Sequence, residues 1–104
     1  MAWLILVFSG ALEAVWATAL GRSEGFSRPV PTLVFAVTAV LSVVGLAFAM
    51  RELPTGTSYA IWVGIGASLT VAYAMLSGAE AASVAKVLLI GGVIGCVIGL
   101  RLVA

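Results

Sequence analysis

The sequence predicts an all-helical integral membrane protein whose chain crosses the bilayer four times. Three observations lead to this fold class. Of the 104 residues, 63% are apolar and only 9% are charged, whereas a soluble domain carries about a quarter charged residues. Four apolar runs, each close to the ~20 residues that cross a bilayer as helix, take up nearly the whole chain. The charged residues gather mostly in the short connections between them.

The apolar runs give the order of the elements within a single domain, residues 1–104. We expect helices over residues 3–20, 30–50, 55–77 and 84–103. The first starts at Trp3, a residue suited to the membrane interface. We interpret it as a span and not as a secretory signal, because no Lys or Arg precedes it and Glu13 interrupts its apolar core. Pro29 and Pro31 flank the start of the second helix and Pro54 that of the third, positions where a missing N–H costs little.

The fourth run carries glycines at every fourth position. Gly91, Gly95 and Gly99 share one helix face, and small residues at this spacing let helix backbones approach closely in lipid. Because a single four-helix bundle fills its own centre with side chains, we expect an oligomer with this face as the dimer contact. The same spacing also fits packing within one chain. Cys96, in the same run, is expected to be a buried, inert thiol.

Charge excludes several classes of function. A net charge of +1 gives no basic surface for nucleic acid, and the lack of histidine leaves proton chemistry to a carboxylate. The basic residues near the predicted helix ends divide almost evenly, three on one side of the membrane and two on the other. The excess of positive charge that normally marks the cytoplasmic side therefore selects no orientation. Either the chain inserts into the membrane in both orientations, or it carries too few charged residues for this rule to select one orientation.

Glu13 is the main candidate functional residue. It lies about 15 Å along the first helix, near the bilayer midplane, where a carboxylate is costly and usually marks an ion or proton pathway. The alternative is a carboxyl that pairs with a basic group to hold helices together. Every basic residue of the chain is predicted near a helix end, so we favour binding of protons or cations at Glu13.

Polar and aromatic residues on the first three predicted helices fit a site for a small organic cation around Glu13. Trp16 lies one turn away and offers an indole N–H or a ring face, although core packing is an equally good interpretation. Ser42 lies at similar depth, where a serine more often bonds to its own backbone. Tyr59 and Trp62 are spaced to share a face. No metal site is predicted, and Glu80 is expected to be a solvated surface charge.

These residues resemble the small multidrug resistance transporters, and more closely their guanidinium-exporter subtype. The resemblance runs through almost the entire chain. Its motifs are Gly10-Ala-Leu-Glu13-Ala-Val-Trp16, Gly25-Phe-Ser-Arg28, Ser42, and the highly specific Leu53-Pro-Thr-Gly-Thr-Ser-Tyr-Ala-Ile-Trp-Val-Gly-Ile-Gly-Ala67. Trp16 favours the guanidinium exporters, because the polyaromatic-cation exporters typically have glycine at that position.

The resemblance implies a multi-pass protein of the bacterial cell (inner) membrane that forms an antiparallel, dual-topology homodimer. It implies a proton-coupled antiporter, not an enzyme, with no cofactor, which exports guanidinium and small substituted guanidinium cations by alternating access. Glu13 would bind proton or substrate in turn. Trp16, Ser42, Tyr59 and Trp62 would line the site, and the fourth helix would supply much of the dimer contact.

Four positions depart from the family pattern: Gly21, Val63, Leu69 and Ala81. They leave two alternatives open. The chain could be one subunit of a heterodimeric pair, or it could export quaternary ammonium or other lipophilic cations. A non-transporting membrane subunit is a third possibility, against which stands the cost of keeping a carboxylate at mid-depth.

Overall fold

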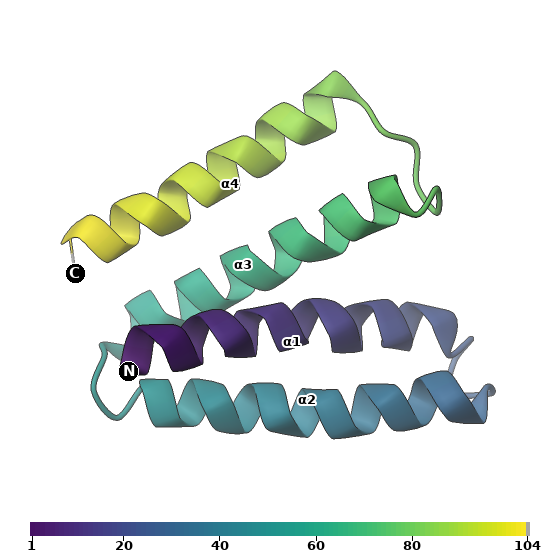
Figure 1. Ribbon diagram of the computed structural model, residues 1–104, viewed down its shortest axis with the longest axis horizontal. Helices are drawn as coiled ribbons and strands as arrows, with labels where there is room; N and C mark the ends of the chain where they lie inside the picture. The colour runs from purple at the N-terminus through teal and green to yellow at the C-terminus, as the bar shows by residue number, and fades with distance from the viewer. Residues whose placement is uncertain (104) are drawn as a thin grey trace.

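The computed structural model describes residues 1–103 and contains four long helices (Figure 1). They are α1 (Ala2–Arg22), α2 (Pro29–Ala49), α3 (Thr55–Leu76) and α4 (Val84–Val103). Each is long and apolar enough to cross a membrane. The predicted fold class, an all-helical protein with four transmembrane helices, is therefore confirmed, and the chain is a multi-pass membrane protein.

A tight loop turns the chain from α1 into α2. Glu24, Gly25 and Phe26 all have positive φ angles, of 50°, 70° and 69°, and reverse the chain within a few residues. The buried Ser23 ties the loop to α1, since its hydroxyl donates to the carbonyl of Leu20 (2.7 Å) and accepts from the N–H of Phe26 (3.2 Å). Pro29 then opens α2 at a position that needs no N–H donor. The two helices run side by side in opposite directions (Figure 1).

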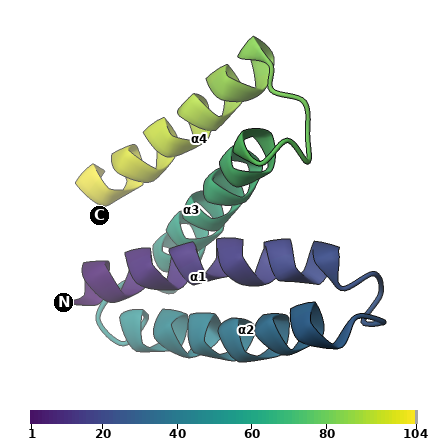
Figure 2. The ribbon, with the colours of Figure 1, turned by 45° about the vertical axis from the view of Figure 1, so that its right-hand side comes forward.

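Helix α1 packs against both α2 and α3, whereas α4 packs mainly against α3 and reaches α1 where Arg101 lies over the Trp3 ring, 4.5 Å from its centre. The core is a buried cluster formed by the start of α1, the end of α2 and the start of α3: Leu6, Leu46, Ala49, Ile61 and Trp62. Glycines bring the helices close, because a Cβ on Gly10 would lie 2.9 Å from the Ile65 side chain and one on Gly45 would overlap Ser9. Towards its other end α3 leans away from α1 (Figures 1 and 2).

Helix α4 buries none of its residues. It meets α3 where Val93 and Val97 approach Gly64. A Cβ built on Gly91, Gly95 or Gly99 would meet no atom within 4 Å among the described residues. The face that carries these glycines is thus uncovered in the single chain. Cys96 is exposed as well, so its predicted burial is wrong for one chain, because α4 turns Val97 and Leu100, and not Cys96, towards the core.

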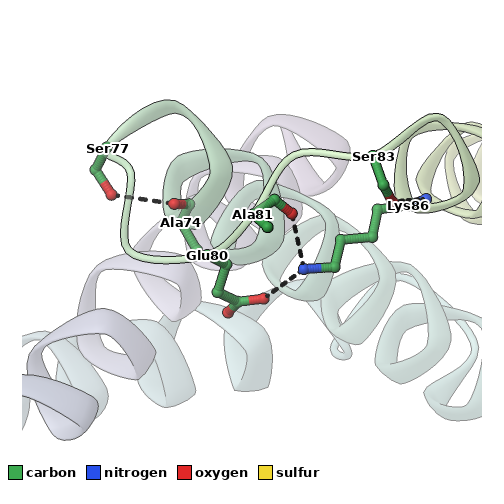
Figure 3. Close-up of polar contacts among 6 residues, drawn as sticks. All are labelled: Ala74, Ser77, Glu80, Ala81, Ser83 and Lys86. Carbon is green, nitrogen blue, oxygen red and sulfur yellow. Dashed lines mark hydrogen bonds and ion pairs between the residues drawn. The ribbon is translucent and has the colours of Figure 1, made fainter.

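The connection between α3 and α4 carries a surface ion pair (Figure 3). The Lys86 ammonium lies 3.3 Å from the Glu80 carboxylate, with both side chains well exposed, and donates to the carbonyl of Ala81 at 3.0 Å. The Ser83 hydroxyl accepts the backbone N–H of Lys86 and so starts α4. An exposed pair of this kind contributes little to stability, so Glu80 is a surface charge, as predicted.

Candidate functional site

Glu13 lies midway along α1 with only 8% of its surface exposed. Its carboxyl group packs directly against α3 at Gly66, where a Cβ would overlap the carboxylate. Within residues 1–103, the Glu13 carboxylate takes part in no ion pair and accepts no hydrogen bond. A buried acid at this depth without a basic partner has the chemistry to bind a proton or a cation from outside the chain.

A chain of hydrogen bonds joins the three packed helices one turn before Glu13. The Trp62 indole donates to the Ser42 hydroxyl (3.1 Å), and Ser42 donates to the backbone carbonyl of Ser9 (2.6 Å). The Ser9 hydroxyl in turn donates to the carbonyl of Ile5 (2.7 Å). Ser42 thus bonds across helices instead of to its own backbone, contrary to the usual behaviour of a lone serine. These hydrogen bonds fix the orientation of the Trp62 ring beside α1.

The two remaining aromatic candidates are placed differently. The Tyr59 ring lies 5.8 Å from the Trp62 ring, so these residues do share a face of α3. Tyr59 is 55% exposed, on a surface that the single chain leaves open. The Trp16 ring meets Phe35 of α2 edge to face at 5.8 Å. Its indole N–H is buried without a hydrogen-bond partner in the described part of the chain, so the bond to Glu13 considered from the sequence is not formed.

The structure therefore brings Ser42, Tyr59 and Trp62 together, whereas the Trp16 ring packs against Phe35 of α2 at the edge of the same core. Sequence reasoning missed the contact of Gly66 with Glu13. The signal for that contact was the spacing of four residues between Trp62 and Gly66 on α3. The role of the Ser9 carbonyl as an acceptor had no signal in the sequence, since every residue carries such a group.

The chain is similar to known proteins along nearly its whole length. The family model of the Small Multidrug Resistance protein matches residues 1–94. The chain is 46% identical over 102 residues to a guanidinium exporter of Yersinia pseudotuberculosis, with 98% of each chain covered. It is 43% identical over 104 residues to a guanidinium exporter of Salmonella typhimurium, covering 100% of this chain and 99% of the relative. A guanidinium exporter of Citrobacter freundii is 40% identical over 102 residues, with 98% and 97% covered.

Proposed function

The chain belongs to the Small Multidrug Resistance family, a family of transporters and not of enzymes, and we propose that it exports guanidinium and small substituted guanidinium cations in exchange for protons. The observation that carries this proposal is the buried Glu13 carboxylate, midway along a spanning helix and without a basic partner among the described residues. The names of relatives that match along nearly their whole length support guanidinium as the substrate.

Competition at one carboxylate is enough to couple the two ions. Guanidinium is planar and holds its N–H donors in a fixed fork, which a carboxylate accepts through two parallel hydrogen bonds. A proton on Glu13 removes that acceptor, so proton and substrate exclude each other. In alternating access, the site around Glu13 faces first one side of the membrane and then the other. If it changes sides only while a proton or a substrate cation is bound, the export of substrate is coupled to the entry of protons.

The residues around Glu13 have distinct tasks in this proposal. Ser42 holds the Trp62 ring in place through their hydrogen bond. The exposed Tyr59 ring, and the Trp62 ring beside it, offer faces that attract a cation. Trp16 contributes an indole N–H that is unpaired among residues 1–103 and can donate to the Glu13 carboxylate after rotation of its side chain. These four residues line the proposed site.

We further propose that two copies of the chain form an antiparallel homodimer through the glycine face of α4. The single chain leaves Tyr59 exposed and buries no residue of α4, so a second copy supplies the missing cover. The nearly even division of basic residues between the two sides of the membrane fits a chain that inserts in both orientations.

Gly95→Leu is expected to abolish the dimer. A leucine there holds two helix backbones apart, and in the single chain the added side chain meets open space. Gly21→Leu is the matched control, because Gly21 also has no atom within 4 Å but lies at the end of α1. Cross-linking in bilayers measures the dimer fraction. An unchanged fraction in Gly95→Leu, or an equal loss in Gly21→Leu, excludes the glycine face as the contact.

Uptake of labelled guanidinium by proteoliposomes tests the function. Vesicles with an acidic interior are expected to accumulate guanidinium as protons leave, and to stop when the gradient is dissipated. Apparent affinity is expected to fall as the outer pH is lowered, since protons then occupy Glu13.

Tetramethylammonium, which cannot donate hydrogen bonds, is expected to compete poorly. Stronger competition by tetramethylammonium than by unlabelled guanidinium identifies a quaternary ammonium exporter instead. No uptake by correctly assembled dimers overturns the proposal for this chain alone and directs the search to a heteromeric partner.

A further inference from the structure

A groove opens on the side of α1 that points away from Glu13. It has a volume of about 550 Å³ and is lined by the second half of α1, the start of α2 and the end of α3. Arg22, at its outer end, follows Glu13 by nine residues, which is two and a half helical turns and therefore the opposite face. The groove is within the size range of ligand sites and is separate from the site around Glu13.

The groove is apolar along its length and cationic at its mouth. Val15, Val34 and Leu69 are typical of its lining. At the mouth, Arg22 donates a hydrogen bond to the Tyr73 hydroxyl at 3.2 Å, and its guanidinium carbon lies 5.6 Å from the centre of the Tyr73 ring. Among the described residues no carboxylate forms an ion pair with Arg22. Its positive charge is thus held in place by a neutral phenol and is not neutralised.

We propose that this groove binds an anionic phospholipid, with one acyl chain along the apolar lining and the phosphate at Arg22. Arg22 is the last residue of α1 and Tyr73 lies in the last turn of α3, so both stand at the membrane interface, the depth of lipid headgroups. Basic pockets between transmembrane helices are known to bind anionic headgroups. The planar guanidinium suits a phosphate, to which it donates two parallel hydrogen bonds.

Charge complementarity favours this occupant over two others. A cationic substrate is repelled by Arg22, so the groove is a poor route for it. The spanning helices of a second copy would bring mostly aliphatic faces, and the carboxylate that α1–α4 carry, Glu13, is buried, so they cannot neutralise the arginine. An anionic lipid satisfies both the apolar lining and the charged mouth, and the bilayer supplies it at high local concentration. The inference stands on the groove alone and does not depend on the proposed transport function.

Native mass spectrometry of the full chain, released from micelles containing phosphatidylglycerol or phosphatidylcholine with identical acyl chains, tests the proposal. The unaltered chain is expected to retain phosphatidylglycerol, and Arg22→Gln to retain about tenfold less. Arg28→Gln is the matched control, since Arg28 is a basic residue of the same loop region but outside the groove lining. Both are exposed residues, so the fold is expected to survive both changes.

Two further arms identify the ligand. Val34→Phe, which fills the apolar part of the groove, is expected to lower the retention of phosphatidylglycerol while leaving Arg22 in place. Glycerol phosphate, a headgroup without acyl chains, is expected not to displace the lipid. Three outcomes overturn the proposal. Equal retention of both lipids would indicate a nonspecific annular contact, and an equal loss in Arg28→Gln would indicate diffuse surface charge. Displacement by glycerol phosphate would indicate a site for free phosphate.

Discussion

Glu13→Gln is expected to reduce proton-driven guanidinium uptake to the level of protein-free vesicles while the fold remains intact. The amide keeps the shape of the carboxyl group against Gly66, but it carries no charge and takes up no proton. A hydrogen bond to a charged group is worth about 1.5–3 kcal/mol, so guanidinium binding alone should weaken by about 10- to 100-fold. Coupling is lost altogether, because no other carboxylate lies at this depth in α1–α4.

Glu80→Gln is the control for this substitution. It removes a carboxylate of the same kind from the α3–α4 connection, where the pair with Lys86 is exposed (Figure 3). Transport and assembly are expected to be unchanged, since exposed pairs contribute little. Guanidinium uptake that still follows the pH gradient in Glu13→Gln contradicts the assignment of Glu13. Circular dichroism and the dimer fraction separate this result from misfolding.

The course of the four helices could be predicted from the sequence because lipid imposes simple rules on a chain. A span must be a helix that satisfies its own backbone, and it must be about 20 apolar residues long. The run of apolar residues and the proline at the start of α2 therefore decide most of the fold. The depth of Glu13 follows from the same rise per residue, without knowledge of the neighbouring helices.

The hydrogen bonds of the site could not be predicted, because they depend on how the helices are rotated against one another. A hydroxyl side chain within a span can donate to a carbonyl on the preceding turn of its own helix, as Ser9, Thr38 and Thr70 do. Ser42 instead reaches Ser9 on another helix, and the buried hydroxyls of Ser58 and Ser68 have no partner among the described residues. Nothing in the local sequence distinguishes Ser42 from the others. Only the close approach of α2 to α1 at Gly45, against Ser9, creates the alternative acceptor.

Trp16 shows the same limit for an aromatic side chain. The spacing of three residues places it one turn from Glu13 on α1, which is why a bond between them was considered. Spacing fixes the positions of backbone atoms but not the rotamer of the ring, which here lies against Phe35. Its part in the site therefore remains a proposal.

Gly66→Ala is expected to reduce guanidinium affinity by about tenfold, an effect similar in size to the loss of one charged hydrogen bond. The added methyl group overlaps the Glu13 carboxyl group and forces it to turn away or α1 and α3 to separate. Gly56→Ala is the control on the same helix, since its Cβ meets no atom within 4 Å. That change should leave affinity unaltered and should not lower stability, because alanine favours helix over glycine.

Comparison with Gly10→Ala separates the positioning of Glu13 from the spacing of the helices. A Cβ on Gly10 presses on Ile65 at the same contact between α1 and α3, and its nearest neighbours are Ile65 and Trp62, not Glu13. If Gly66 acts only by keeping the helices close, the two variants will lose affinity in proportion to their loss of thermal stability. If Gly66 positions the carboxylate, Gly66→Ala will lose more affinity than Gly10→Ala at equal stability, and the pH dependence of binding will shift in Gly66→Ala alone. Guanidinium binding measured against pH in both variants therefore decides whether the carboxylate or only the packing depends on this glycine.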